Sequence, residues 1–512
     1  MRALRCPHCV IRAALRRQMC VVAASSGAHR TRTPLSEERR HELLSVPQTL
    51  GVEVAPIPSH FKKRAVALHL GYVGAPFKGN QSNSTLPRGS TVDDVVEDAL
   101  LAAGLILPTN YGSRGLSRLA WSRSSRTDKG VSSLATIVTC RLEVDEAWWP
   151  PQGGDGLQLC DLVNSKLPPL VRVFAASPVP RRFQARHACS TRTYHYLLPL
   201  HVLSSDAAVA AERIATLYAA LQRFQGTHPF HNFTARARYR PGAVNKKKTG
   251  AAKPAIDSAP RDEEDEGEGD EETGTEEAPA PAVVAAPVPP GIDGAYATGT
   301  YWCVTPQQGD AVGNAHFRRI ADTAVQGPFV CVHTGTPYVR IVFVGESFLL
   351  HQIRKMVATA VAVARGRLGI DFIEAALTRP SRARTPMAPA STLVLADASF
   401  WPFKPDTSGG PRTGEEGSDS TEHQPQQRSL AISDATRARV AAWATEVLEP
   451  SLGPALASDD WQEWIANLDG PLACPLPEEV AVIVAYAREY RATRMLRDIV
   501  AAAEGDATCH EV

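Results

Sequence analysis

The chain has 512 residues, 44% of them apolar and 21% charged, and no run approaches the ~18 uninterrupted apolar residues of a membrane span; this excludes an integral membrane protein and predicts about three domains at most. Its ten cysteines are scattered, and the CxxC pair Cys6 and Cys9 has no second pair, which argues against a disulfide scaffold and a structural zinc site. The net charge of +1 hides two basic blocks that suit a polyanion, because residues 61–244 hold 22 basic and 12 acidic side chains and residues 301–403 hold 10 and 6.

The N-terminal residues 1–36 contain seven arginines and no acidic residue. At about 100° per residue, Arg5, Arg12 and Arg16 share one face of a helix and apolar residues lie opposite. This composition is typical of an organelle transit peptide, and a disordered basic arm that aids RNA binding is the alternative. We therefore expect residues 1–60 to lie outside the fold and the protein to reach a mitochondrion or chloroplast.

The first basic block alternates strand and helix patterns. Strands are predicted at 65–70, 134–144, 171–175 and 192–198. A helix is predicted to open with a capping box of Ser90 and Asp93 and to end at Gly104. A second helix carries apolar residues at three-to-four spacing from Ile214 to Phe224. Since no glycine-rich phosphate loop appears, the pattern predicts an α+β or α/β body without an obvious nucleotide fold.

The second half contains an insert, a folded block and a helical tail. Residues 245–300 hold 5 basic and 13 acidic side chains, a composition that predicts disorder. The Lys246–Lys248 triplet there is the one feature that favours the nucleus as an alternative location. A strand at 339–344, a buried helix at 348–364, a linker at 406–428 and helices at 431–448 and 478–503 follow.

One segment places a single carboxylate among three cations. Asp128 stands between Arg123, Arg126 and Lys129, directly before a strand and next to Gly130, which can adopt a left-handed turn. Positive neighbours keep a carboxylate ionised and ready to act as a nucleophile, and the cations are candidate RNA-binding residues. The alternative is ordinary turn chemistry, because an Asp beside a Gly is common in loops.

A second segment, residues 181–196, interleaves arginines with aromatic residues. Arg186 and Arg192 are candidate RNA-binding residues there, because aromatic rings can stack on an unpaired base while arginines bind its phosphates. Tyr194 and Tyr196 share one face of the predicted strand. The alternative is that both rings pack in the core.

Two further segments contain histidines and a helical arginine. His228 and His231 have no Cys, Asp or Glu at a ligand spacing, so structural polar contacts are expected rather than a metal site. Arg354 lies on an apolar helix, where a cation costs free energy unless it is paired. It therefore needs a carboxylate partner from elsewhere in the chain.

Taken together, four motifs resemble the TruA-type tRNA pseudouridine synthases, and more closely their eukaryotic branch. In chain order they are RTDKGVSS at 126–133, RTYHYLLP at 192–199, FQGTHPFHNFT at 224–234 and GESFLLHQIRKMV at 345–357. The likeness runs from about residue 62 to 403, apart from the acidic insert. It implies an α+β fold of two domains, whose antiparallel sheets join around a basic RNA-binding cleft.

The resemblance also implies roles for particular residues. Asp128 would be the catalytic aspartate, Tyr194 would stack on the target uracil or take part in proton removal, and Arg354 would pair with Asp128. Arg126 would help to open the RNA stack or fill the place of the base. The implied partner is tRNA or another structured RNA, and no cofactor is required.

This sequence departs from the family pattern at four places. Asn80 precedes Gln81 where the family usually has an aromatic residue or Met, Ser125 replaces a small Ala, and Glu346 replaces Gln. The late A-P-G-x-G-L-like segment appears at 388–393 without its glycines, which puts loop geometry near the cleft in doubt.

The predicted organisation follows. Residues 1–60 form the targeting or disordered arm, 61–200 an N-terminal catalytic domain, 201–403 a C-terminal catalytic domain with the disordered insert, 404–430 a linker and 431–512 a helical extension. The expected function is conversion of specific uridines in tRNA to pseudouridine by an aspartate nucleophile or base. A non-catalytic RNA-binding protein, such as a tRNA-folding chaperone, is the alternative. A carboxylate-dependent hydrolase fits less well, since no paired acids appear in the basic blocks.

Overall fold

The computed structural model describes residues 51–112, 115–149, 154–235, 312–379, 381–403, 429–430, 432–470 and 473–507. The predictions for the targeting arm up to residue 50, for the 245–300 insert and for most of the 404–430 linker concern residues outside these ranges. Within these ranges, no helix is long and apolar enough to cross a membrane.

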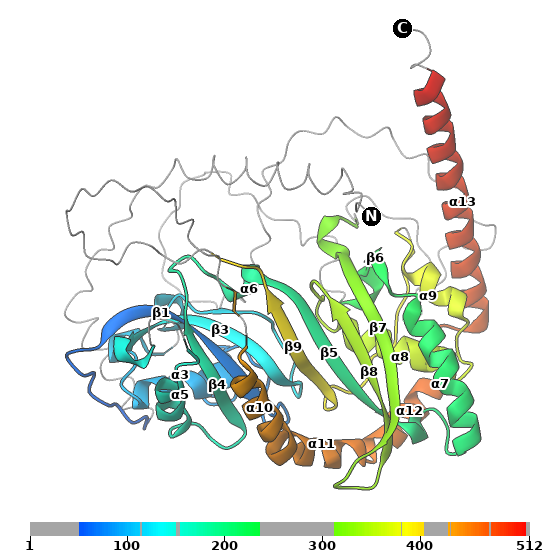
Figure 1. The fold of residues 1–512 in the computed structure, drawn as a ribbon. Helices are drawn as coiled ribbons and strands as arrows, with labels where there is room; N and C mark the ends of the chain where they lie inside the picture. Colours follow the sequence, from blue (N-terminus) through cyan, green and yellow to red (C-terminus); the bar gives the residue numbers. More distant parts are fainter. Residues whose placement is uncertain are drawn as a thin grey trace, which may run out of the picture.

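One mixed sheet runs through the described part of the chain (Figure 1). The strand order is β4-β1-β3-β9-β5-β8-β7-β6, and the short β2 pairs with β3 outside this path. Neighbours are antiparallel except β3 and β9, which are parallel. The bounds are β1 Lys62–Tyr72, β2 Ser122–Arg123, β3 Ser132–Val144, β4 Val171–Pro178, β5 Cys189–Pro199, β6 Gly226–Pro229, β7 Phe317–Val330, β8 Pro337–Gly345 and β9 Leu393–Phe400.

The two halves of the sheet meet at a short junction. Ser132 and Ser133 of β3 pair in parallel with Val394 and Leu395 of β9. β5 pairs with both β8 and β9, so it belongs to the half that is completed by the later sequence. A boundary at residue 200 therefore separates β5 in sequence from the strands that flank it in the sheet.

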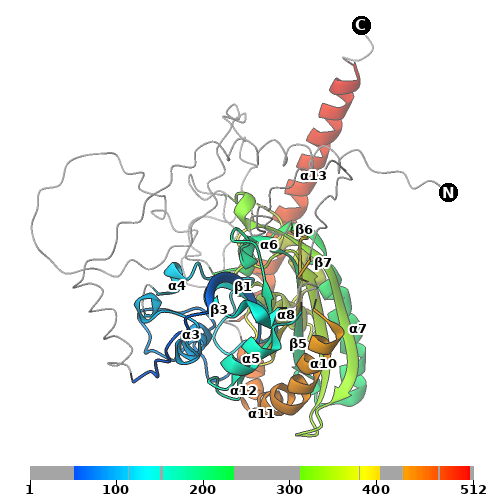
Figure 2. The same ribbon diagram turned by 60° about the vertical axis from the view of Figure 1, so that its left-hand side comes forward.

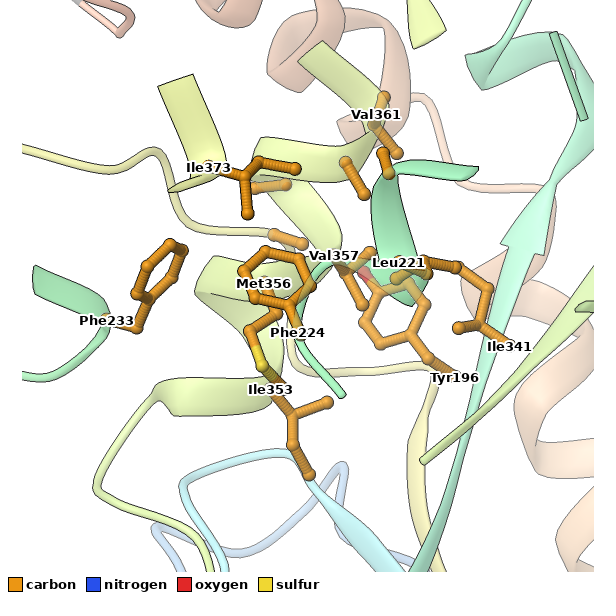
Figure 3. Packing of buried hydrophobic residues seen from close by; sticks show 14 of the residues in the cluster. Tyr196, Leu221, Phe224, Phe233, Ile341, Ile353, Met356, Val357, Val361 and Ile373 are labelled. Carbon is orange, nitrogen blue, oxygen red and sulfur yellow. The ribbon is translucent and has the colours of Figure 1, made fainter. Parts of the chain in front are cut away.

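Helices cover this sheet and enclose two main hydrophobic clusters. One cluster is built from β1, β3, β4, α3 and α5. The other is built from β5, β7, β8, β9, α7, α8 and α9, with α12 (Asp460–Asp469) and α13 (Pro477–Ala507) of the C-terminal extension. Figure 3 shows the second cluster, where Tyr196 of β5 lies near Leu221 of α7 and Ile341 of β8. The bounds are α3 Val92–Ala102, α4 Gly115–Arg118, α5 Leu157–Asn164, α6 Ala185–Ala188, α7 Ala207–Gln222, α8 Gln352–Ala364 and α9 Ile370–Ala376.

Two predicted helix starts are wrong. The capping box of α3 uses Thr91 and Asp94 rather than Ser90 and Asp93, because Asp93 is instead paired with Arg123 across the fold. The buried helix begins at Gln352 and not at residue 348, since His351 adopts a left-handed backbone with φ 64° that interrupts the helical path.

The C-terminal extension packs against both halves of the sheet. Figures 1 and 2 show α10, the π-helical turn and α11 following one another along one side of the sheet, and α13 leaving the body. Trp443 packs against Phe174 of β4 with ring centroids 5.6 Å apart, and Trp461 against Tyr196 at 6.4 Å. The bounds are α10 Asp434–Trp443, the π-helix Ala444–Leu448, α11 Glu449–Leu456, α12 Asp460–Asp469 and α13 Pro477–Ala507. The extension thus contacts a strand of each half of the sheet.

Candidate active site

A cleft of about 740 Å³ lies where the loop after β2 faces the start of α8. Asp128 is the sole carboxylate among its described lining residues, whereas eight arginines line it. We call it the arginine-lined cleft. Its arginines are Arg123, Arg126, Arg141, Arg181, Arg186, Arg192, Arg318 and Arg354. Such a positively charged surface attracts a polyanion, and it brings that polyanion close to the one carboxylate in the cleft.

Asp128 lies in the loop between β2 and β3 and keeps a side-chain exposure of 20%. Arg354 Nη1 and His351 Nε2 each lie 3.7 Å from Asp128 Oδ2. Gly130 has φ 83°, the left-handed turn that the sequence predicted, and it redirects the chain into β3. The carboxylate therefore meets two nitrogen-bearing side chains of the α8 start while one face stays open to the cleft.

Arg354 is held in place by the segment before β9. Its Nε donates to the carbonyl of Ala388 over 2.8 Å, and the Ala388 N–H donates back to the Arg354 carbonyl over 3.1 Å. The side chain is only 15% exposed, so its charge needs a counter-charge, and Asp128 is the carboxylate within reach. The glycine-poor 388–393 segment thus still supports the arginine that faces Asp128.

His351 is a residue of this site that the sequence reasoning did not single out. His351 is part of the fourth motif, but the sequence does not show its backbone conformation. In the structure it is a non-glycine residue in the left-handed region, and such strained residues are often found at functional sites. Burial lowers the pKa of His351 below its ordinary value, Asp128 acts to raise it, and Arg354 and Lys355 lower it further. The neutral imidazole is therefore favoured near pH 7.

For the expected isomerisation of uridine, we predict that the rate of His351→Asn near pH 7 stays within about threefold of the wild-type rate. On acidification, the rate of the variant should fall less steeply than that of wild type. As the pH falls through the lowered pKa, His351 becomes a cation and competes with the substrate for Asp128. Asn tolerates the left-handed backbone, so the variant removes the imidazole without new strain.

The measurement is a pH–rate profile of wild type, His351→Asn and His187→Asn. His187 is an exposed histidine that lines the same cleft, so its variant controls for general loss of a ring. Identical acid limbs in all three proteins would show that His351 has no influence on Asp128.

The two tyrosines of β5 have different surroundings. Tyr196 is fully buried, and its hydroxyl donates to the Pro389 carbonyl over 2.9 Å, so this ring serves the core. Tyr194 is 6% exposed, lines the cleft and contacts the ring of Phe348 edge-to-face at 5.2 Å. Burial raises the pKa of Tyr194 to about 12, so its phenol stays protonated.

Two of the candidate RNA-binding arginines have internal partners instead. Arg123 forms a short ion pair with the buried Asp93. Arg192 is 9% exposed and donates to the Ser124 carbonyl, to Ser125 Oγ and to the Glu346 carbonyl. Their guanidinium groups hold the loop that leads to Asp128, so both arginines have a structural role beside the RNA binding predicted for them.

The other candidates remain accessible. Arg126, Lys129 and Arg186 are exposed, and Arg126 and Arg186 line the cleft. Charge alone could not separate these residues from Arg123 and Arg192, because the partners of the latter come from distant parts of the chain. Of the five candidate RNA contacts, these three side chains are the most exposed.

We expect Arg192→Ala to lower the free energy of unfolding by about 2–4 kcal/mol, because three backbone or side-chain acceptors lose a charged donor in a buried place. Arg186→Ala should change it by less than about 0.5 kcal/mol, since that side chain is exposed. Denaturant titration of both variants measures the difference. Equal stability of the two would contradict the internal role of Arg192.

The histidines of the third motif make structural contacts, as expected. The two ring nitrogens of His231 lie 2.9 Å from the Pro229 carbonyl and 2.7 Å from the Ser381 carbonyl. His228 Nε2 lies 2.7 Å from the Gln225 carbonyl. Across the described ranges, no group of three His, Cys, Asp or Glu side chains could hold a metal ion.

Comparison with known proteins shows which sequences this chain resembles. Residues 301–400 match the family model described as tRNA pseudouridine synthase. The Pseudouridylate synthase 1 homolog of Mus musculus is 24% identical over 351 residues, which cover 67% of this chain and 62% of that protein. The tRNA pseudouridine synthase 1 of Eremothecium gossypii is 27% identical over 376 residues, covering 65% and 62%.

A third relative, the tRNA pseudouridine(27/28) synthase of Saccharomyces cerevisiae, is 25% identical over 348 residues, which cover 65% of this chain and 83% of that protein. The chain spans about three fifths of the length of the first two relatives. The family-model match falls on β7, β8, α8 and β9, and thus on the elements that carry Arg354 and His351. The chain is thus similar to tRNA pseudouridine synthases over about two thirds of its length, and its residues 301–400 match the model of that family.

Proposed function

We propose that this chain converts specific uridines of tRNA to pseudouridine and that Asp128 is its catalytic carboxylate. The observation that carries the proposal is the position of Asp128 in a cleft otherwise lined by arginines, with Arg354 Nη1 at 3.7 Å. RNA phosphates neutralise the arginines, and the one carboxylate remains to meet a nucleotide drawn between them. The same feature disfavours a two-carboxylate hydrolase, because the described lining offers no second acid.

The reaction exchanges one bond for another. The bond between uracil N1 and ribose C1′ breaks, the base turns, and a bond between C5 and C1′ forms. N1 gains a proton and C5 loses one, so the product is an isomer and no cofactor is consumed. Asp128 can add to C1′, which gives a covalent adduct, or remove a proton from C2′, which gives a glycal-like intermediate; both routes need an ionised carboxylate.

Access to the sugar requires that the target nucleotide leaves its helix. This costs a few kcal/mol, which contacts between phosphates and the exposed Arg126 and Arg186 offset. Tyr194 and Phe348, in edge-to-face contact on the wall of the cleft, offer apolar surface to the extruded uracil. A neutral Tyr194 phenol can also take part in a proton relay.

We further propose that residues 61–200 and 201–403 act as two catalytic domains around this cleft. The two hydrophobic clusters on either side of the β3–β9 junction support this division, with β5 acting as part of the second. Both sides contribute to the cleft, since Asp128 comes from the first and Arg354 from the second.

The proposed destination is a mitochondrion or chloroplast, and the argument for it is the arginine-rich, acid-free composition of residues 1–36. Fusing residues 1–60 to a fluorescent reporter and following its location in cells tests this. Import into an organelle supports the proposal. Accumulation of the full chain in the nucleus would favour the Lys246–Lys248 triplet instead.

The chemistry is tested with tRNA transcripts that carry tritium at C5 of uridine. Because C5 loses its hydrogen when the new bond to C1′ forms, the proposal predicts that tritium appears in water with time. Tight binding of the tRNA without tritium release would favour the non-catalytic RNA-binding alternative. Release of free uracil would show hydrolysis instead of isomerisation.

A further inference from the structure

The side chain of Asn80 forms a bracket on the loop that carries Asp128. Asn80 is 3% exposed, its Nδ2 donates to the Ser125 carbonyl over 2.9 Å, and its Oδ1 accepts from the Thr127 N–H over 3.1 Å. One amide therefore binds the backbone on both sides of Arg126. Because both groups are buried, neither hydrogen bond is replaced by water when it is lost.

The bracket is anchored to α3. The Asp93 N–H donates to the Asn80 carbonyl over 3.0 Å, at the start of that helix. The chain also approaches closely, since the Asn80 N–H donates to the Thr127 carbonyl and a Cβ at Gly79 would lie 3.3 Å from that same oxygen. Asn80 thus fixes the loop relative to the start of α3 through hydrogen bonds to both.

Its place in the loop differs from that of the other supports. Arg192 binds Ser124 and Ser125, and the hydroxyl of Tyr72 binds Oγ1 of Thr127 over 2.8 Å. The Asn80 amide binds the backbone N–H of Thr127, the residue directly before Asp128. A small rotation of that peptide moves the carboxylate relative to Arg354.

The residue type is also a departure of this chain. The resemblance described above implies an aromatic residue or Met at this position, and neither carries the adjacent N–H donor and carbonyl acceptor of a side-chain amide. A polar side chain buried without need would cost free energy, so its two matched hydrogen bonds indicate that it has replaced apolar packing as the support of the loop.

We propose that Asn80 is a positioning residue, which fixes the Ser125–Thr127 backbone so that Arg126 faces the cleft and Asp128 faces Arg354. This inference rests on the proposed function for its kinetic consequence. Its structural consequence, a constrained Thr127 N–H, is independent of that function. Displacement of a reacting group by about 1 Å costs on the order of a hundredfold in rate.

The chain offers a matched control. Asn164 of α5 makes the same pair of bonds with Val173 of β4, with Nδ2 donating over 2.9 Å and Oδ1 accepting over 2.8 Å. It does not line the arginine-lined cleft. Asn164→Met and Asn80→Met therefore remove the same chemistry from a structural place and from the proposed positioning place.

The experiment measures Tm, kcat and KM for tRNA, and hydrogen–deuterium exchange of the peptide that contains Thr127. The Tm of both Met variants should be lower than that of wild type. Asn80→Met should lower kcat by about 10- to 100-fold with KM within about threefold, and Thr127 should exchange faster, whereas Asn164→Met should keep kcat and Thr127 exchange unchanged. Asn80→Ala is the second variant in case Met does not fit.

The outcomes separate the two proposals. Wild-type kcat in both Asn80 variants would overturn the positioning role, as would unchanged exchange at Thr127. An equal decrease of kcat in the Asn80 and Asn164 variants would show that Asn80 acts only through the overall stability of the fold, and it would also overturn the positioning role. Absence of isomerisation by wild type would instead refute the proposed function, and the exchange data would still decide whether the bracket exists.

Discussion

Asp128→Asn is expected to reduce the rate of tRNA isomerisation by more than about a thousandfold. The substitution keeps the size of the side chain and removes its charge, so the amide can neither add to C1′ nor take a proton from C2′. Fold and RNA contacts should persist, because the arginines of the cleft are untouched. Single-turnover release of tritium from C5-labelled tRNA measures the rate, and a filter-binding titration measures tRNA affinity, which should stay within severalfold.

A matched substitution keeps this prediction specific. Asp322→Asn alters an exposed aspartate of β7 outside the cleft lining and should leave both rate and affinity unchanged. A rate for Asp128→Asn within tenfold of wild type would end the assignment of Asp128 as the catalytic group. A large loss of tRNA affinity would place Asp128 among the groups that organise the RNA surface.

Arg354→Ala is expected to lower both rate and stability. The variant leaves Asp128 without its nearest guanidinium and the Ala388 carbonyl without a donor, in a place where Arg354 itself is 15% exposed. We expect kcat to fall by about 100-fold or more and the free energy of unfolding to fall by about 2–4 kcal/mol. Single-turnover rates and denaturant titration measure the two effects.

Arg365 provides the control for this variant. It forms an ion pair with Asp469 and donates to the Val202 carbonyl over 2.7 Å, at a side-chain exposure of 14%. Arg365→Ala should therefore cost a similar amount of stability and leave kcat unchanged, since it does not line the cleft. Normal melting together with full rate in Arg354→Ala would refute the pairing with Asp128.

Local sequence patterns predicted most strands and helices of the described body. The strand patterns at 65–70, 134–144 and 339–344 lie within β1, β3 and β8, because these strands bury side chains on both faces. Gly104 follows α3 as expected, with φ 68°, whereas α7 already ends at Gln222, before Gly226. These features depend on neighbours in sequence, and sequence patterns report such neighbours well.

Non-local contacts account for the errors. Ser90 with Asp93 and Thr91 with Asp94 fit the capping-box pattern equally, and the choice follows from the pairing of Asp93 with Arg123 from β2. Apolar residues 348–350 continue the period of α8, yet Phe348 packs against Tyr194 and Leu350 is 56% exposed. The helix period cannot show that the left-handed backbone of His351 separates residues 348–350 from α8.

The same reason limits what the sequence revealed of the site. Asp128 and Arg354 were found through motifs and through the need of a buried cation for a partner, and the structure brings them to 3.7 Å. Arg123 and Arg192 carried the same charge signal as Arg126, but internal acceptors occupy them. Asn80 was visible only as a departure, because its two partners lie in a loop distant in sequence.

The most direct measurement of the central claim is chemical mapping of pseudouridine in unmodified tRNA after incubation with wild type and with Asp128→Asn. We predict modification at discrete uridines by wild type and at none of them by the variant, although both proteins bind the tRNA. The same modified positions with both proteins, or none with wild type despite binding, would contradict catalysis by the Asp128 carboxylate in the arginine-lined cleft.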